Sequence, residues 1–508
     1  MCLKKTVFFL ICVSLTNCTQ KPNIVLILAD DLGWNDVSYH GSNQIPTPNI
    51  DALAYNGIIL DRFYTQPACT PSRAALLTGQ YPIRTGFQGF VIHAGENRYL
   101  PHDVKLLPEK LQDLGYNTNL IGKWHLGYAY RNVTPTYRGF DYHFGYWNGV
   151  IGYFDHIAED EGLTGFDMRR NFDVMWSTQN QYATELFTTK AMEVIMNHNE
   201  TTPLFLLVSH LAPHAGKRGV VYEVPDEAAN NEKFWYIQDD NRRKYAGMVD
   251  ELDKSVGKII QALFEKGILD NTIILFMSDN GAQTVGPVQA NSGSNWPFRG
   301  MKFTAFEGGI RNVAFMYYSR LKQKNVVYDG LMHITDVYPT LLGAIGENTN
   351  DLKLDGINQW NTLMQNGESN RTEVLINIDE VENWSGIIFD GLKLINGSGS
   401  FNQTLEGFYG DDGRNSSNPP YDPIKVLNST ANKALNSNLT EALILQLRNK
   451  TDIGNCRLDY DGNNCNEGKM CLFDLINDPC ETTNYPRKIN HMIQIQIQFI
   501  LIIPGPHG

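Results

Sequence analysis

The sequence predicts an α/β protein in which helices flank a large, mixed but mainly parallel sheet, followed by a smaller C-terminal domain with an antiparallel sheet. Short apolar runs recur along the first part of the chain, and polar groups follow each run at once. Helical patterns such as 104–114 and 244–263 lie between these runs, an alternation typical of a parallel sheet covered on both faces. Beyond residue 373 strand-like runs flank a turn at Asp390 and Gly391, which indicates an antiparallel sheet.

Four of the predicted strands end in polar side chains. In chain order they are 24–28 before Asp30 and Asp31, 118–121 before Lys123 and His125, 204–208 before His210 and His214, and 273–277 before Asp279 and Asn280. The carboxyl ends of parallel strands form the edge at which α/β proteins bind ligands. We therefore expect these side chains to meet at one place.

The acidic strand ends suggest a metal site. Three carboxylates and an amide oxygen form a donor set that suits Ca²⁺ or Mg²⁺ better than zinc. Taken singly, each Asp-rich segment could instead be an ordinary turn, but clustered carboxylates repel one another unless a cation joins them. With Lys123, His125 and His214 from the other two strand ends, such a site would bind a tetrahedral oxyanion such as sulfate or phosphate.

Residues 69–79 form a second distinctive segment, which reads Cys-Thr-Pro-Ser-Arg-Ala-Ala-Leu-Leu-Thr-Gly. Pro71 and Gly79 bracket a predicted helix over 72–78. Cys69 is then expected just before a helix N-terminus, where the helix dipole favours negative charge. A cysteine without a partner is often only a buried one, so this position alone assigns it no role.

This segment resembles the type I sulfatase motif Cys-x-Pro-Ser-Arg-x-x-x-Leu-Thr-Gly at every fixed position. Further segments resemble motifs of the same family and extend the resemblance over nearly the whole chain: 23–31, 47–51, 122–127, 212–214, 278–281, 295–300 and 307–309. The stretches 295–302 and 478–481 resemble the branch that contains arylsulfatases B, I and J. The resemblance implies an alkaline-phosphatase-like fold and a sulfuric ester hydrolase, in which a formylglycine-generating enzyme converts Cys69 to formylglycine.

The resemblance also implies a role for each polar side chain. One Ca²⁺ ion would be held by Asp30, Asp31, Cys69, Asp279 and Asn280. The implied catalytic residues are Cys69, Arg73, Lys123, His125 and His214, and the implied substrate contacts are Lys123, His214 and Lys302. Hydrated formylglycine would supply the nucleophilic oxygen, His125 would help to release sulfate, and His214 would protonate the leaving alcohol. The implied substrate is the 4-sulfate of N-acetylgalactosamine in glycosaminoglycans such as chondroitin or dermatan sulfate.

Three alternatives stay open. Another sulfated sugar or aryl ester is the first, because the stretch 142–176 matches the family only loosely and loops often set substrate choice. Its aromatic side chains could stack on sugar rings or simply pack inside the loop; they are Tyr146, Trp147, Tyr153 and Phe154. A phosphate monoesterase is the second, although such enzymes often carry Ser or Thr at the nucleophile. An inactive protein that binds sulfated glycans is the third, although no implied residue is lost.

Charge and the N-terminal segment bear on partners and location. A formal net charge of −13 argues against nucleic acid as a main partner. Residues 1–18 are typical of a cleaved signal peptide, although a lipoprotein acylated at Cys18 is an alternative. No later segment is apolar enough over the length of a membrane span. We therefore expect export, to a lysosome or to the outside of the cell.

The remaining predictions concern the C-terminal part. We expect the catalytic domain over 19–375, the smaller domain over 376–485 and an atypical tail over 486–508, which is either an edge strand or a misassigned gene end. Asn-x-Ser/Thr sites are dense after residue 369, which predicts a glycosylated face. Four cysteines could form two disulfides in an oxidising compartment, with the pairing left open; they are Cys456, Cys465, Cys471 and Cys480.

Overall fold

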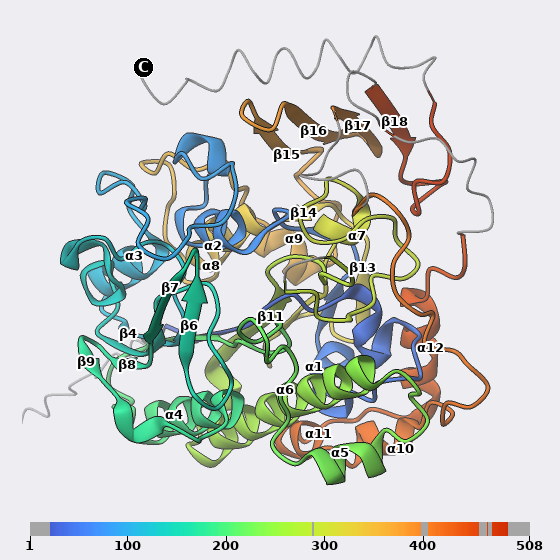
Figure 1. Ribbon diagram of the computed structural model, residues 1–508, viewed down its shortest axis with the longest axis horizontal. Coiled ribbons are helices and arrows are strands. Elements are labelled where there is room, and N and C mark those ends of the chain that lie inside the picture. The colour runs from blue at the N-terminus through green and yellow to red at the C-terminus, as the bar shows by residue number, and fades with distance from the viewer. Residues whose placement is uncertain (1–20, 287–288, 398–404, 457–464, 466–469, 486–508) are drawn as a thin grey trace, which may run out of the picture.

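A computed structural model describes residues 21–286, 289–397, 405–456, 465 and 470–485. At its centre lies a ten-stranded sheet (Figure 1). Across the sheet the strands are β13 (Val326–Tyr328), β2 (Ile58–Leu60), β12 (Ala314–Tyr317), β11 (Thr272–Ser278), β1 (Asn23–Ala29), β10 (Leu204–Ser209), β4 (Asn117–Lys123), β5 (Tyr142–Tyr146), β8 (Arg169–Arg170) and β9 (Asp173–Val174). The five central strands from β11 to β5 are parallel, and antiparallel pairs flank them. The predicted mixed, mainly parallel sheet is confirmed.

The central strands are buried on both faces. Every residue of β1, β10 and β11 is buried, as expected for parallel strands covered by helices on each side. Alternate residues of β1 enter two separate apolar cores, with Val25 and Ile27 in one and Leu26 in the other. These apolar runs hold the strand ends at fixed positions.

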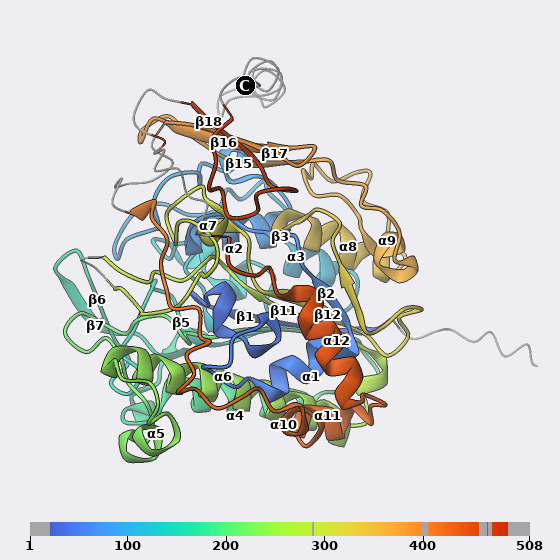
Figure 2. The ribbon, with the colours of Figure 1, turned by 90° about the vertical axis from the view of Figure 1, so that its right-hand side faces the viewer.

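Helices form a layer on each face of the sheet (Figure 2). One face is covered by α1 (Pro48–Asn56), α4 (Ala183–Asn197), α6 (Asp240–Glu265), α10 (Pro423–Leu427), α11 (Thr430–Leu435) and α12 (Glu441–Thr451), with α5 (Glu227–Lys233) beside α6. The other face carries α2 (Cys69–Thr78), α3 (Leu107–Asp113), α8 (Val337–Ala344) and α9 (Trp360–Gln365). The predicted helices 104–114 and 244–263 correspond to α3 and α6. Asp239 starts α6, since its side chain accepts a hydrogen bond from the Arg242 backbone N–H at 2.7 Å.

A four-stranded antiparallel sheet stands apart from the large sheet, as predicted (Figure 1). Its strands are β15 (Glu373–Asp379), β16 (Trp384–Phe389), β17 (Leu392–Asn396) and β18 (Met470–Asp474). The expected turn joins β16 to β17, and both Asp390 and Gly391 have positive φ there. The remaining elements are the strand pairs β3 (Phe63–Tyr64) with β14 (Met332–His333) and β6 (Ile157–Asp160) with β7 (Leu163–Phe166), and the short helix α7 (Glu307–Ile310).

The C-terminal segments cross between the two parts of the molecule. Helices α10 to α12 belong to the predicted domain 376–485 in sequence. However, α10 packs on α1, α11 packs on α1 and α6, and α12 packs on α10 and β13, so the domain boundaries stay a prediction. The disulfides join Cys456 to Cys480 and Cys465 to Cys471. No helix among the described residues is both long and apolar enough to cross a membrane. The predicted signal 1–18, with Cys18, and the tail 486–508 lie outside the described residues.

A buried ion network joins the small sheet to the rest of the protein. Lys393 on β17 lies 2.7 Å from Oε1 of Glu307 and 2.7 Å from Oε1 of Glu481, and all three side chains are fully buried. Lys393 also donates to the backbone oxygen of Ala305 at 3.1 Å. Burial, opposed by Lys393, raises the pKa of Glu481 to about 7, and the charge of Glu307 adds to the rise. Two glutamates that share one lysine thus favour a proton on Glu481.

This network predicts a pH-dependent stability. The folded state holds a proton that the unfolded chain releases near pH 4.5, so the stabilisation is complete below that pH and is lost as the pH rises through about 7. Glu481→Gln stays neutral at every pH. Its free energy of unfolding should therefore improve relative to the unchanged protein between pH 4.5 and 7, by about 3 kcal/mol.

Denaturant unfolding at several pH values measures this difference. Glu382→Gln is the control, because Glu382 is exposed. A Glu481→Gln difference that stays constant across the pH range would contradict the account.

Candidate active site

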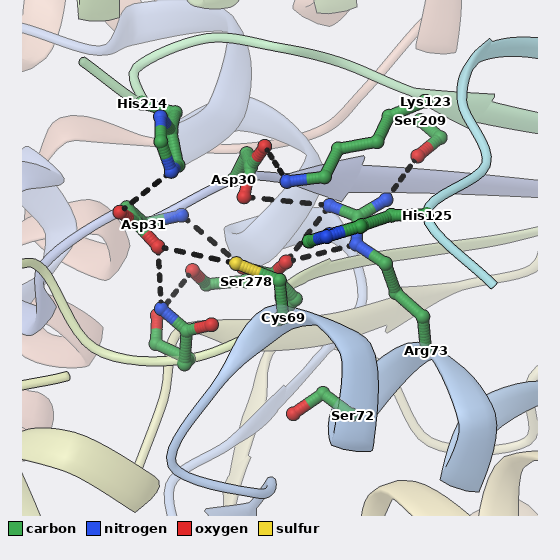
Figure 3. A network of polar contacts seen from close by, with 12 residues as sticks. Asp30, Asp31, Cys69, Ser72, Arg73, Lys123, His125, Ser209, His214 and Ser278 are labelled. Atoms are coloured by element: carbon green, nitrogen blue, oxygen red, sulfur yellow. Dashed lines mark hydrogen bonds and ion pairs between the residues drawn. The ribbon is translucent and has the colours of Figure 1, made fainter. Parts of the chain in front are cut away.

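The predicted strand ends do meet at one edge of the large sheet. Ala29 of β1 pairs with Ser278 of β11, and Ser209 of β10 pairs with Gly122 of β4. The polar residues that follow these strands therefore lie at the same level (Figure 3). Ten predicted site residues are buried there: Asp30, Asp31, Cys69, Arg73, Lys123, His125, His214, Asp279, Asn280 and Lys302. His210 also follows a predicted strand end and is buried, but it does not join this group. Its Nε2 lies 3.0 Å from Oγ of Ser255 on α6.

Cys69 lies at the start of α2. The helix was expected over 72–78, with Cys69 just before it, but α2 begins at Cys69 itself. The first turn forms earlier because the Ser72 N–H donates to the Ala68 backbone oxygen at 3.0 Å. The Ser72 hydroxyl also bonds both backbone polar groups of Gln66, which fixes the chain entering the helix. Gly79 ends the helix with a φ of 65°.

Each buried carboxylate of the site has a cationic partner. Lys123 Nζ donates to Asp30 at 2.7 Å, and Arg73 donates to Asp279 through Nε at 3.1 Å and Nη2 at 2.8 Å (Figure 3). Lys302 Nζ donates to Asp31 at 2.9 Å. When all six groups are ionised their charges sum to zero, although burial and the charge of Asp30, opposed by Arg73 and Lys123, raise the pKa of Asp279 to about 7. Burial alone would raise the pKa of Asp30, but the charges of Lys123, His214, Arg73 and Lys302 together outweigh it and lower that pKa.

The thiol of Cys69 is not activated in this setting. Its Sγ lies 3.9 Å from Oδ1 of Asp31, and within the described part of the chain no second cysteine pairs with it. Burial raises the pKa of Cys69 to about 12, against the attraction of Lys123 and Lys302. The helix N-terminus was expected to favour a negative charge on Cys69, but the effect of burial on the thiol is larger. A thiol held protonated at neutral pH is a weak nucleophile.

Both histidines are held by one ring nitrogen and present the other to the site. His214 Nδ1 lies 2.6 Å from the Ala215 backbone oxygen, so this nitrogen carries the proton and Nε2 faces Lys302 Nζ at 3.2 Å. His125 Nε2 lies 3.0 Å from the Ile92 backbone oxygen, and its Nδ1 has no hydrogen-bond partner among the described residues. Burial lowers the pKa of both rings, so each has a basic nitrogen.

The donor set fits a divalent cation. Asp30 Oδ1 and Asn280 Oδ1 are buried without a hydrogen-bond partner among the described residues. One ligand atom from each of Asp30, Asp31, Cys69 and His214 lies within 4.8 Å of the others. The oxygen donors of this cluster are those that Ca²⁺ prefers. Asp279 is outside that group of four, and its oxygens accept from Arg73 and from the Asp31 N–H at 3.1 Å.

A cavity of about 330 Å³ opens above Cys69, a volume typical of small-ligand sites. His125, His214 and Lys302 line it with Cys69. Gly149 lines it too, and any side chain at this position would lie 2.8 Å from the His125 ring. The arrangement can bind a tetrahedral oxyanion between cationic groups and two neutral imidazoles.

The four aromatic side chains for which stacking on sugars was one of two alternatives do not line this cavity. Tyr146 and Tyr153 are fully buried, and the Tyr153 hydroxyl donates to the His214 backbone oxygen. Trp147 and Phe154 pack against neighbouring rings, so loop packing, the alternative reading, holds for all four. The aromatics that line the cavity are Phe90 and Phe303. Phe303 is adjacent to Lys302 in the sequence, a signal that could have pointed to it.

Comparisons with known proteins agree with this geometry. The sulfatase family model, described as "Sulfatase", matches residues 22–347. Mouse arylsulfatase J is 41% identical over 368 residues, which are 72% of this chain and 59% of that protein. Human N-acetylgalactosamine-6-sulfatase is 34% identical, over 68% of this chain and 66% of its own. The match thus spans less than two thirds of these two relatives.

Solved structures extend the similarity to almost the whole chain. Ps i-CgsB in complex with k-i-k-neocarrahexaose superposes with a TM-score of 0.73 at 25% identity, covering 96% of this chain and 94% of that one. The crystal structure of Ps i-CgsB alone gives 0.72 at 26% identity, with the same coverage.

The paired charges predict a large cost for removing one partner. Arg73→Met leaves Asp279 buried without its cation, and uncompensated buried charges cost about 3–5 kcal/mol. The free energy of unfolding, measured with denaturant in the presence of a chelator, should fall by that amount. Arg170→Met is the control, because Arg170 and Asp173 form an exposed ion pair and should lose less than about 1 kcal/mol. Equal losses for the two variants would contradict the account.

Proposed function

The chain belongs to the sulfatase family, and we propose that it hydrolyses sulfate esters in the cavity above Cys69. One observation carries this proposal: a buried cysteine with a protonated thiol lies at the start of α2, beneath a cavity lined by Lys302 and two neutral histidines. The thiol itself is a poor nucleophile. In members of the family in general this cysteine is converted to formylglycine and a metal ion is bound. Both the modified residue and the ion fit the side chains of this site.

Formylglycine and the metal ion have separate roles in the proposed reaction. Formylglycine at position 69 would supply, as its hydrate, an oxygen nucleophile with a built-in route for release. A Ca²⁺ ion held by Asp30, Asp31, Asp279 and Asn280 would neutralise charge on the ester. Substrate binding and proton transfer are assigned to the side chains described above.

The cationic side chains orient residue 69 and its substrate. Asp279 holds Arg73 and Asp30 holds Lys123, so both cations stay fixed beside residue 69 and steady negative charge there. Lys302 Nζ and His214 Nε2 lie 3.2 Å apart, so both contact a single sulfate group. Sulfate monoesters are anionic, and positive groups placed before the reaction favour their approach.

The histidines carry the proton transfers in this proposal. His214, fixed by the Ala215 oxygen, would take up on Nε2 the proton that the attacking hydroxyl of residue 69 loses, and give it to the leaving alcohol. His125 Nδ1, without a partner in the described part of the chain, accepts a proton from residue 69 when sulfate is released. Each ring is neutral because it is buried, so each can serve as a base.

For the substrate we propose a sulfated carbohydrate, and more closely the 4-sulfate of terminal N-acetylgalactosamine in a glycosaminoglycan. The name of the N-acetylgalactosamine-6-sulfatase relative supports this sugar but makes its 6-sulfate the competing candidate. The 4-position rests on the resemblance of the stretches 295–302 and 478–481 to the branch that contains arylsulfatase B. The predicted signal and two disulfides support a secretory, lysosomal or extracellular location. There a formylglycine-generating enzyme would act on Cys69 during synthesis.

Turnover of a simple sulfate ester tests the proposed reaction. Protein from a eukaryotic secretory host should release 4-nitrophenol from 4-nitrophenyl sulfate, and Cys69→Ala should lower kcat by at least about a thousandfold, as loss of a nucleophile does elsewhere. A chelator should abolish turnover, and Ca²⁺ should restore it. Faster hydrolysis of 4-nitrophenyl phosphate than of the sulfate would instead favour a phosphate monoesterase. Undiminished activity of Cys69→Ala would contradict the proposal.

A further inference from the structure

The outer wall of the cavity carries side chains that the proposed sulfate chemistry does not use. Phe90, His93, Asp160, Glu161 and Phe303 line this wall, above the base formed by residue 69, the two histidines and Lys302. The wall is assembled from three parts of the chain: the loop after α2, the β6–β7 hairpin and the segment that carries Lys302. His125, whose buried Nδ1 lacks a partner among the described residues, lines the same cavity.

One side of the wall is a row of stacked rings. The Phe303 and Phe90 ring centroids lie 5.0 Å apart with planes 22° apart, and Phe90 and His93 follow at 5.4 Å and 29°. Lys302 Nζ lies 5.2 Å from the Phe303 ring centre, so the row starts directly beside the proposed sulfate contact. Flat apolar surfaces with a few polar groups are typical of small-ligand sites, and the carbon face of a sugar ring matches such a surface.

The other side of the wall is acidic. Asp160 accepts a hydrogen bond from the Ala94 N–H at 2.7 Å and lies 3.2 Å from His93 Nδ1. Glu161 Oε1 lies 3.9 Å from the same nitrogen. These contacts fix the hairpin turn against the loop after α2. Among the described lining residues Lys302 is the one lysine or arginine, so the base of the cavity is cationic while its rim is anionic.

We propose that this rim selects a sugar ring with a single sulfate and no other negative group, and that Asp160 and Glu161 determine this preference. This inference rests on the proposed sulfatase function and specifies the charge that a preferred sugar substrate carries. Carboxylates accept hydrogen bonds from sugar hydroxyls. A second sulfate or a carboxylate on the ring would lie near two like charges, which is unfavourable although the Asp160 and Glu161 side chains are 33% and 67% exposed.

Three sulfated sugars measure this preference: N-acetylgalactosamine 4-sulfate, its 6-sulfate and its 4,6-disulfate. The disulfate contains whichever ester the enzyme cleaves. A preference for the 4- or the 6-position therefore does not affect the comparison between the better monosulfate and the disulfate. The better monosulfate should exceed the disulfate in kcat/KM by roughly tenfold. Glu161→Gln and Asp160→Asn should each reduce this ratio at least about threefold. Glu159→Gln is the matched control, because Glu159 is on the same hairpin but does not line the cavity, and its ratio should not change.

The outcomes separate this inference from the proposed function. No turnover of 4-nitrophenyl sulfate by protein that carries formylglycine would defeat the proposed function itself. Turnover of that ester without turnover of any of the three sugars would overturn the inference alone. A ratio near one in the unchanged protein would also overturn it, as would a ratio that neither rim variant alters. Because Asp160 also bonds the Ala94 N–H, Glu161→Gln decides the matter if Asp160→Asn does not fold.

Discussion

The burial of three carboxylates at one edge of the sheet is the constraint on which the rest of the site depends. Asp30, Asp31 and Asp279 are fully inaccessible, and buried charges are tolerated only with well-placed partners. Arg73, Lys123 and Lys302 supply those partners from α2, the end of β4 and a loop far along the chain. The helix that carries residue 69 is thereby tied to the sheet. A divalent cation added to this neutral set would make the site positive, which suits an anionic ester.

The same burial decides what Cys69 can do. Without solvent, the thiol keeps its proton, and the two rings beside it stay neutral. The unmodified residue therefore lacks the thiolate on which cysteine nucleophiles depend. An oxygen nucleophile at this position needs no thiolate and can use the neutral imidazoles as bases. The geometry is thus consistent with formylglycine chemistry and a poor fit to cysteine chemistry.

Much of the site could be predicted because strand ends leave a local signal. The apolar runs before Asp30, Lys123, His214 and Asp279 placed four groups at one edge, since parallel strands share that edge. His210 could not be separated from His214 in this way, because its contact with α6 depends on the fold. Lys302 has no strand signal and entered through the family resemblance alone. The stacked and acidic walls were missed because loops distant in sequence create them.

The most direct test is the chemical identity of residue 69. Trypsin should release the peptide 63–73 from protein made in a eukaryotic secretory host, and mass spectrometry can read the residue within it. The account predicts formylglycine at position 69 in most of the material. An unmodified cysteine, in a host shown to modify another sulfatase in the same culture, would contradict it. The site would then be that of a metal-binding relative without this chemistry.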